Sequence, residues 1–284
     1  MEKIFNKILV EVNASSTGLI ATEITAEIAQ KFCSKVTIIH VISHEFMHPE
    51  LRALMEVPDN VIREMDEVYG ETGKKIIRSA EEFFKEKSIA NTSELVKAED
   101  PAEKILQISE KNGYDLLVTG NVPENKTNRF CLGSVAEKLS LYAKSPVLIA
   151  KRKTAFKKLL VATDGSSKAS KAVDYAIQLC QSFDAKMTLL NAEEKSLLRF
   201  KPKEAKKISE HILNAATEKA KGVTFYPRME IGDPATAILK VARQEDSDII
   251  VLGSRGISSI KRFLLGSVSS EVSIKAQCSV LIIR

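Results

Sequence analysis

The stretch Arg129-Phe130-Cys131-Leu132-Gly133-Ser134-Val135 returns further along the chain as Arg262-Phe263-Leu264-Leu265-Gly266-Ser267-Val268. Over the 22 aligned positions that begin at Arg129 and Arg262, 11 residues are identical, and both copies run on to the triplet Val-Leu-Ile. A Gly-Ser pair that opens an amphipathic helix presents backbone N–H groups without partners and the positive end of the helix dipole, which together bind phosphate groups. The repeat therefore predicts two similar halves, each with a candidate phosphate-binding helix start.

Short β-branched runs alternate with longer helical patterns in each half, which is typical of βαβ units and a parallel sheet. The runs are almost entirely apolar, as expected for strands that helices cover on both faces. We therefore expect an α/β protein with two tandem, doubly wound, parallel five-stranded sheets. The expected strands are 7–12, 36–41, 93–98, 116–119, 147–150, 158–163, 186–192, 224–230, 249–252 and 280–283. The expected helices are 17–32, 60–87, 101–112, 134–143, 167–183, 202–221, 234–244 and 267–276.

A polar stretch at 151–156, between one expected strand and the next, separates the halves. With 284 residues the chain is long enough for two ordinary domains, which we expect at 1–152 and 153–284. The first half carries 18 additional residues within 43–92. The sequence leaves open whether that segment is a lid, a second interface or an ordinary packed helix.

The composition, 44% hydrophobic and 28% charged, is typical of a globular protein. With 42 basic against 37 acidic residues and no basic block interleaved with aromatic residues, nucleic acid is not an expected partner. No apolar run approaches the roughly 20 residues of a membrane span, and the first residues lack a signal-peptide apolar region. We therefore expect a cytoplasmic protein without a membrane partner. Cys33, Cys131, Cys180 and Cys278 occur singly in apolar segments, which predicts buried, unreactive thiols.

Polar residues and glycines gather where the expected strands of the second half end. Asp164 follows the first strand, where its carboxylate can accept hydrogen bonds from ribose hydroxyls or can instead cap the next helix. Gly253 and Gly256 follow the fourth strand, where glycine lets the backbone approach a ligand and adopt a positive φ. The amides and hydroxyls at 266–269 open the last helix, and Arg255 adds positive charge. Because ligands of doubly wound sheets lie beyond the carboxyl ends of the strands, we expect these groups to form one anion site.

The spacing Gly253-x2-Gly256-x9-Gly266-Ser267 resembles, residue for residue, the Gly-x2-Gly-x9-Gly-(Ser/Thr) nucleotide-binding signature of the universal stress proteins. Asp164 after the first strand and Gly232-Asp233-Pro234-Ala235 before the third helix fit the same family. The resemblance covers essentially the whole chain, once per half. The chain therefore looks like a tandem universal stress protein.

The resemblance implies an ATP- or AMP-binding α/β domain in each half, with strand order 3-2-1-4-5. It implies Mg²⁺ on the phosphates where ATP is bound, and no metal site built from the protein itself. It also implies that the last strands of the halves pair across a pseudo-two-fold axis as an intrachain pseudo-dimer, while a homodimer of the whole chain stays open. The implied nucleotide contacts are Ala192, Thr163 and Leu252 at the base, Asp164 and Gly253 at the ribose, and Gly256, Gly266, Ser267, Val268 and Ser269 at the phosphates.

The first half departs from this signature. Asn13 stands in place of the aspartate, and Pro123 stands where the second glycine should be. Proline has a fixed negative φ and no N–H, so it can neither donate to a phosphate nor take a positive φ. What survives of the degenerate first site is Val41 on the base side, Gly120, and the helix start Gly133-Ser134. We expect weak or absent nucleotide binding here, with a small anion or AMP as the alternative.

Residues His44-Glu45-Phe46-Met47-His48 spell the H-E-x-x-H pattern of zinc hydrolases. That chemistry requires both histidines on one helix face and a third ligand, for which Glu64 and Glu67 are equal candidates. Pro49 follows at once and argues against a helix there. A zinc hydrolase built on His44, Glu45 and His48 is therefore a remote alternative.

No Walker A sequence, Gly-x-Ser-x-Gly elbow or positioned general base accompanies the predicted phosphate site. We therefore expect no catalytic residues, at most slow ATP hydrolysis, and a regulatory stress-response module whose nucleotide orders the 253–266 loop for an unknown protein partner. The alternative from another class is an interaction scaffold in which neither half binds nucleotide. The sequence does not decide between ATP and AMP, and it names no signal or partner.

Overall fold

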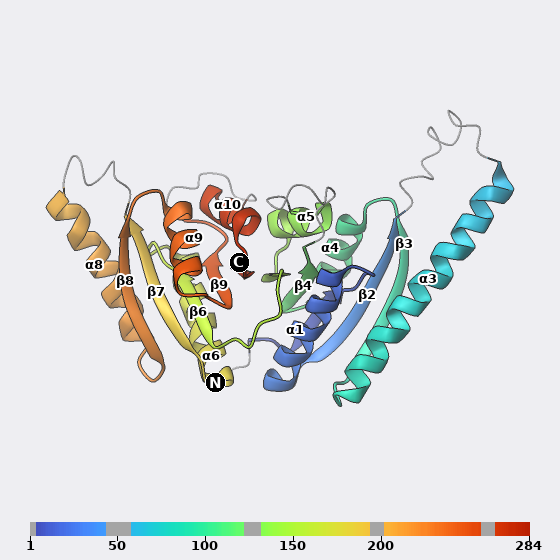
Figure 1. The fold of residues 1–284 in the computed structure, drawn as a ribbon, viewed down its shortest axis with the longest axis horizontal. Coiled ribbons are helices and arrows are strands. Elements are labelled where there is room, and N and C mark those ends of the chain that lie inside the picture. Colours follow the sequence, from blue (N-terminus) through green and yellow to red (C-terminus); the bar gives the residue numbers. More distant parts are fainter. Residues whose placement is uncertain (1–3, 44–57, 122–131, 194–201, 257–264) are drawn as a thin grey trace.

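The computed structural model describes residues 4–43, 58–121, 132–193, 202–256 and 265–284 (Figure 1). The strands are β1 (Lys7–Glu11), β2 (Lys35–Ser43), β3 (Asn91–Ala98), β4 (Leu116–Gly120), β5 (Val147–Ala150), β6 (Lys158–Ala162), β7 (Lys186–Glu193), β8 (Thr224–Ile231), β9 (Ile249–Gly253) and β10 (Ser279–Ile283). The helices are α1 (Ser16–Phe32), α3 (Asp59–Glu86), α4 (Pro101–Asn112), α5 (Ser134–Tyr142), α6 (Ser167–Phe183), α8 (Pro202–Lys219), α9 (Pro234–Gln244) and α10 (Ser267–Lys275).

All ten strands form one sheet, in the order β3-β2-β1-β4-β5-β10-β9-β6-β7-β8. Counted within each half, this is the expected order 3-2-1-4-5, and every strand pair inside a half is parallel. The two expected five-stranded arrays are both present, and they join along one edge into a single sheet. The halves thus share a single continuous hydrogen-bonded layer.

The join is the antiparallel pair of β5 and β10, in which Leu148 lies opposite Leu281. Every residue of both strands is buried. Left unpaired, two apolar strands of this kind would be edges open to association with other chains. The predicted pairing of the last strands of the two halves is therefore confirmed.

Helices cover both faces of the sheet, which explains why the strands read as apolar runs. One buried cluster joins the sheet to α1, α3, α6 and α8, and a second joins it to α4, α5, α9 and α10. Along β1 the side chains alternate between the two clusters, with Ile8 and Val10 in the first and Leu9 in the second. In Figure 1, α3 and α8 lie on the outer sides, while α5 and α10 lie near the centre. None of the described helices combines the length and apolar character needed to cross a bilayer.

A cation from each half closes a helix of the other half at the join. Lys151 Nζ donates to the main-chain oxygens of Ser273, Ile274 and Ala276, at 2.6, 3.2 and 2.8 Å, at the end of α10. Arg284, the matching position of the repeat, donates to two main-chain oxygens near the end of α5, at 3.3 and 2.5 Å. The last carbonyls of a helix lack intrahelical partners and carry its negative end. The two halves therefore complete each other's helices.

Two of the three described cysteines behave as expected. Cys180 and Cys278 are buried, and burial raises the pKa of their thiols to about 12 and about 11. Cys33 is exposed, because it is the left-handed residue (φ 52°) that ends α1. The prediction that it is buried is wrong, and Cys131 lies outside the described residues.

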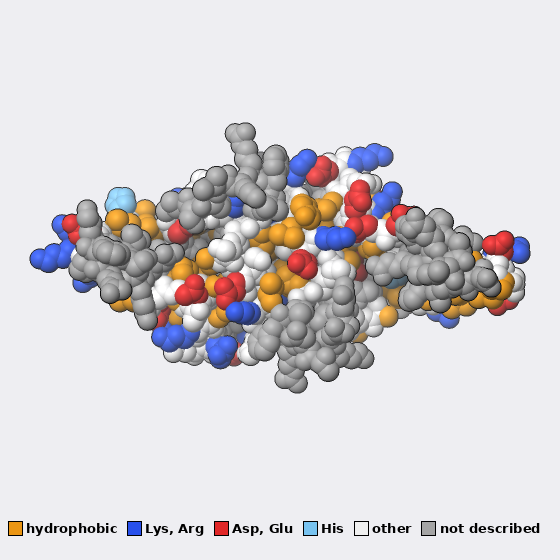
Figure 2. All heavy atoms as spheres, turned by 90° about the horizontal axis from the view of Figure 1, so that it is seen from above, with side chains coloured by type: hydrophobic (Ala, Val, Ile, Leu, Met, Phe, Trp, Pro, Cys, Tyr) orange, Lys and Arg blue, Asp and Glu red, His pale blue; other side chains and the backbone are white. Residues whose placement is uncertain are grey.

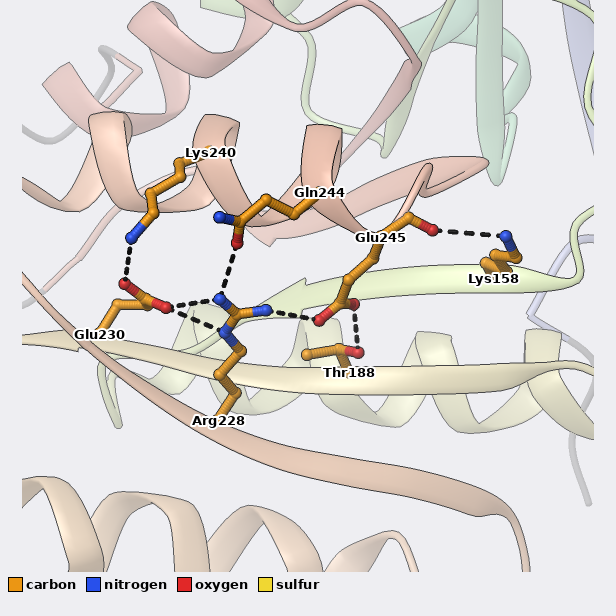
Figure 3. Close-up of polar contacts among 7 residues, drawn as sticks. All are labelled: Lys158, Thr188, Arg228, Glu230, Lys240, Gln244 and Glu245. Carbon is orange, nitrogen blue, oxygen red and sulfur yellow. Dashed lines mark hydrogen bonds and ion pairs between the residues drawn. The ribbon is translucent and has the colours of Figure 1, made fainter.

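Arg228 ties the edge strand β8 to α9 through a network of side chains (Figure 3). Its guanidinium contacts Glu230 at 2.6 and 3.0 Å, Glu245 at 2.8 Å and Gln244 at 2.8 Å. Thr188 of β7 donates to the other oxygen of Glu245 at 2.6 Å. The network crosses from β7 and β8 to the helix above them, so it fixes α9 over the outer strands.

Replacing Arg228 with methionine is expected to lower the free energy of unfolding by about 1–2 kcal/mol, because several charge-assisted hydrogen bonds are lost from a partly buried site. The control is Lys240→Met, which removes the more exposed contact to the same Glu230, at 3.1 Å, and should cost about 0.5 kcal/mol or less. Urea unfolding followed by circular dichroism measures both. Equal losses in the two variants would mean that Arg228 contributes no more than a surface ion pair.

Candidate functional site

The loop that follows β6 is held by its own side chains. Thr163 is buried, and its amide donates to the Leu190 oxygen of β7 at 2.9 Å. Asp164 Oδ1 accepts from the Ser166 amide at 3.0 Å, and Ser166 Oγ accepts from the Ala169 amide at 3.2 Å. Ser166 is therefore the N-cap residue of α6, and the alternative in which Asp164 caps that helix is wrong. Asp164 instead turns the chain into the helix and keeps its carboxylate at the strand end.

Gly253 and Gly256 are required by close contacts and not by backbone conformation. Neither has a positive φ, so that part of the expectation is wrong. A Cβ at Gly253 would lie 2.7 Å from the Ala169 nitrogen and 2.7 Å from the Lys168 carbonyl carbon, both in the α6 backbone. A Cβ at Gly256 would overlap Oδ2 of Asp164. The loop after β9 thus packs directly against α6 and against the candidate ribose acceptor.

The start of α10 has no side-chain cap, although α1, α4, α6 and α9 each have one. Its N-cap residue is Gly266, whose amide donates to the Ser254 oxygen at 2.8 Å. Ser269 Oγ donates to the Gly253 oxygen at 2.7 Å, so its proton is already in use. Ser267 is exposed. The helix start therefore lies beside the 253–256 loop, with first-turn N–H groups that no side chain closes.

The candidate base contacts lie on the neighbouring strands. Ala192 is half-buried near the end of β7, and Leu252 is buried opposite Ala162 of β6. Val268 is partly buried against the same apolar cluster as Leu252. The structure thus places the predicted residues at the carboxyl ends of β6, β7 and β9 and at the start of α10. They are Thr163, Asp164, Ala192, Leu252, Gly253, Arg255, Gly256, Gly266, Ser267, Val268 and Ser269.

Figure 2 looks down on this end of the sheet from above Figure 1. Hydrophobic side chains lie at the centre of the described surface, and acidic and basic side chains are scattered around them. The described part of this face carries no broad block of one charge.

The first half carries a buried carboxyl group where the second half has Ala162. Glu11 Oε2 accepts from Thr119 Oγ1 at 2.9 Å, and Glu11 Oε1 accepts from Asn13 Nδ2 at 2.8 Å. Burial raises the pKa of Glu11, against the opposing effects of the two hydrogen bonds and of His40. Sequence reasoning missed this group, although a glutamate at the end of the apolar run KILVE is a visible signal.

The polar groups around Asn13 are bonded to one another up to the start of α5. Asn13 Oδ1 accepts from Ser15, whose Oγ lies 3.2 Å from Thr17 Oγ1. Thr17 Oγ1 donates to the Asn121 oxygen at 2.8 Å, and Asn121 Oδ1 accepts from the Gly133 amide at 3.1 Å. The side chains on the ribose side of the first-half site are therefore bonded to one another, whereas the start of α5, like that of α10, has no side-chain cap.

Some predicted features lie outside the described residues. They are the H-E-x-x-H segment at 44–48 and Pro123. Within the residues that are described, no group of three or more His, Cys, Asp or Glu side chains could hold a metal ion. The zinc interpretation therefore gains no support from the described part of the chain.

The Gly232-Asp233-Pro234-Ala235 segment has a structural function. Gly232 has φ +146°, and Asp233 Oδ1 accepts from the Thr236 amide at 2.8 Å as the N-cap of α9. Hydrogen bonds from the side chain and the amide of Thr236 lower the pKa of Asp233.

A cavity of about 100 Å³ lies near the amino ends of β9 and β10, lined in part by Arg152, Arg243 and Cys278. It is therefore at the opposite end of the strands from the candidate site.

The model of the universal stress protein family matches this chain twice, at residues 5–151 and 155–284. The chain belongs to the universal stress protein family. A curated relative, the universal stress protein YxiE of Bacillus subtilis (strain 168), is 37% identical over 147 residues, covering 45% of this chain and 99% of that protein. Tandem universal-stress modules and the α/β fold are therefore established for this chain.

A solved structure supports the arrangement of the whole chain. The universal stress protein from Archaeoglobus fulgidus DSM 4304 has a TM-score of 0.74 at 20% identity, covering 100% of this chain and 99% of that one. A second solved structure is of a universal stress protein in complex with cAMP. It is 30% identical, covers 45% of this chain and 97% of that one, and has a TM-score of 0.39. The first similarity concerns the fold, and the second describes a ligand of that other protein.

Proposed function

We propose that the second half of this universal stress protein binds ATP or AMP at the carboxyl ends of β6, β7 and β9. The observation that carries the proposal is the uncapped start of α10 beside the 253–256 loop and the Asp164 carboxylate. Backbone N–H groups at a helix start bind phosphate oxygens, and a carboxylate accepts hydrogen bonds from the ribose hydroxyls. We keep 1–152 and 153–284 as the proposed boundaries of the two domains.

Each part of the pocket has one chemical task in this proposal. Thr163, Ala192 and Leu252 contact the base, and Asp164 and Gly253 contact the ribose. The phosphates meet the amides of 267–269, beside Gly256 and Gly266, because the Gly266 amide itself donates to the Ser254 oxygen. Mg²⁺ accompanies ATP through its phosphates, since the described residues offer no carboxylate cluster for it. Ser269 contributes its amide, because its hydroxyl proton is donated to Gly253.

The first half is proposed to be a structural partner and not a second nucleotide site. Its hydrogen-bond chain from Glu11 to Gly133 is internally satisfied. A nucleotide would have to break those bonds and would recover few of them, which lowers its net affinity.

The proposed role is regulatory, in the cytoplasm, with a protein partner that reads the nucleotide-bound surface. None of the residues placed at the phosphate end is a base positioned to activate water: Arg255 is a permanent cation, and Asp164 is assigned to the ribose. Hydrolysis of ATP is therefore expected to be slow. Whether the whole chain forms a homodimer is a separate question, which the molar mass from light scattering would answer.

Gly266→Val is expected to weaken ATP and AMP binding by about a hundredfold, or 2.7 kcal/mol, because its side chain would stand over the α10 amides. Its Cβ lies 3.4 Å from the Arg255 Cα and the Ser254 oxygen, an ordinary contact, so the fold should tolerate the change. The matched control is Gly133→Val at the same place in the first half. Isothermal titration calorimetry with each nucleotide measures both variants.

Mass spectrometry of the small molecules that co-purify would identify the physiological nucleotide. Equal affinity in wild type and Gly266→Val would contradict the proposed site. If wild type shows no heat of binding and no thermal shift with millimolar nucleotide, the result would support the alternative function, an interaction scaffold in which neither half binds nucleotide.

A further inference from the structure

Three cationic side chains converge beside the join of the two halves. Ser254 donates its amide to the Ile283 oxygen at 2.7 Å, which places Arg255 next to Arg284 at the ends of β9 and β10. Lys168 is the second residue of α6, and its Cβ would lie 2.9 Å from a Cβ on Gly253. The backbones that carry the three cations are therefore neighbours.

The same place receives the start of α6. Ser166, its N-cap residue, donates its hydroxyl to the Arg255 oxygen at 3.2 Å. That bond holds the Arg255 backbone against the first turn of a 17-residue helix. The positive end of the helix dipole thus adds to the three side-chain charges.

Among the described residues, no carboxylate side chain forms an ion pair with the three cations, and the nearby Asp164 carboxylate lies against Gly256 and the Ser166 amide. Neither Lys168 nor Arg255 forms an ion pair with any described residue. The Nε atoms of Arg255 and Arg284 are buried and have no hydrogen-bond partner among the described residues. Arg284 contacts only main-chain oxygens of α5, and Lys171 donates to the main-chain oxygen of Arg284 at 2.9 Å. A buried guanidinium N–H without an acceptor is costly, and such groups are normally satisfied.

Mutual repulsion within the cluster is visible in the acid–base properties of its members. Burial, followed by the charges of Lys171, Arg255 and Arg284, lowers the pKa of Lys168. Burial, followed by the charge of Arg255, lowers the pKa of Arg284 to about 10. A dianion placed among them would counter the repulsion between these charges, which adds to the larger effect of burial.

Among its described residues, the first half has no equivalent cluster. Thr17 stands at the position of Lys168, and it donates to Asn121 of its own half. Val122 stands at the sequence position of Arg255, and Lys151, which matches Arg284, is satisfied by three carbonyl oxygens. The cations therefore accompany the half that carries the intact glycine signature.

We infer that Lys168, Arg255 and Arg284, with the start of α6, bind a phosphate group at the join of the two halves. The guanidinium N–H groups left without acceptors would donate to its oxygens. Because Arg284 also closes α5, the bound phosphate connects the 253–256 loop of the second half to a helix of the first. The phosphate is either free inorganic phosphate or the terminal phosphate of ATP; only the second source rests on the proposed nucleotide site.

Calorimetric titrations at constant ionic strength test this inference with three probes: inorganic phosphate, ATP and AMP. The test variants are Lys168→Gln and Arg284→Gln, of which the first leaves the Arg284 hydrogen bonds to the α5 carbonyls in place. The control is Lys111→Gln, which removes one exposed charge from α4 of the first half. Loss of one charge-assisted contact is expected to weaken phosphate binding by about tenfold.

The source of the phosphate follows from which titration changes. If inorganic phosphate binds to wild type and to Gly266→Val but about tenfold more weakly to Lys168→Gln, the site takes free phosphate. If instead Lys168→Gln removes a preference of wild type for ATP over AMP, the site takes the terminal phosphate of the nucleotide. Unchanged binding of all three probes in both test variants would overturn the inference, as would an equal loss in Lys111→Gln. Failure of AMP to bind wild type would count against the nucleotide proposal alone.

Discussion

Gly253→Ala will lower the free energy of unfolding by about 3 kcal/mol, near the upper end of the cost of overpacking a core. The added methyl would lie 2.7 Å from two backbone atoms of α6, the Ala169 nitrogen and the Lys168 carbonyl carbon. Backbone atoms cannot rotate away as a side chain can, so α6 must move off β9. Chemical unfolding followed by far-ultraviolet circular dichroism measures the loss.

Two matched glycines make this result interpretable. Gly120→Ala, at the same place in the first half, should cost a similar amount, since its Cβ would lie 2.6 Å from the Thr17 carbonyl carbon. Gly70→Ala, inside α3 with no atom within 4 Å of the added Cβ, should stabilise the protein by about 0.5–1 kcal/mol. If Gly253→Ala and Gly70→Ala behaved alike, the close approach of α6 to β9 would not be what requires the glycine.

The same glycine shows why part of the fold could be predicted from the sequence and its reason could not. Runs such as 147–150 and helices such as 234–244 are specified locally by apolar pattern and capping residues, and the structure places them within a residue or two of the expected bounds. The need for Gly253 depends on a helix that begins 86 residues earlier and packs across the strand. Spacing identified the residue, and only the packing identified the constraint.

The joined sheet has a similar explanation. Apolar edge strands predicted that β5 and β10 would pair, which joins the two arrays, but they did not specify how the two strands would align. That outcome depends on register, with Leu148 opposite Leu281, and on the exchange of caps by Lys151 and Arg284. Neither residue has a local signal, because a lysine or arginine after a strand is usually read as a solvated end.

The parts of the candidate site that depend on backbone N–H groups could be predicted from the sequence. The parts that depend on contacts between buried side chains could not. The glycine and serine spacing located the start of α10 and the 253–256 loop. Glu11 and Thr119 were missed, because each strand taken alone gives no reason to expect its polar residue to meet the other. Their contact distinguishes the two halves chemically, since Ala162 and Leu252 hold the corresponding places.

Glu11→Gln is expected to remove a pH-dependent loss of stability that the wild-type protein shows above pH 4.5, the ordinary pKa of the side chain. Burial raises the pKa of Glu11 in the folded state, so its contribution to stability is fully present below pH 4.5 and is lost as the pH rises through the folded-state pKa. The difference in unfolding free energy between variant and wild type should grow by about 1.4 kcal/mol for each unit by which folding raises that pKa, and then level off. Unfolding in urea at intervals from pH 4 to pH 9 measures this difference.

The glutamine should fit because each hydrogen bond has a replacement. Its carbonyl oxygen can accept from Asn13 Nδ2, and its amide can donate to Thr119 Oγ1, whose own proton can turn to the Gly120 oxygen at 3.3 Å. The charge of His40 on β2 opposes the rise of the Glu11 pKa, so the comparison is made as a difference between two chains that share His40. Glu99→Gln, an exposed carboxylate, is the control for the change in net charge and should give a flat difference across the same pH range. If the difference in unfolding free energy between Glu11→Gln and wild type also stays constant across this pH range, the Glu11 carboxyl group is solvated in solution. The proposal that the first half is a structural partner would then lose its main support.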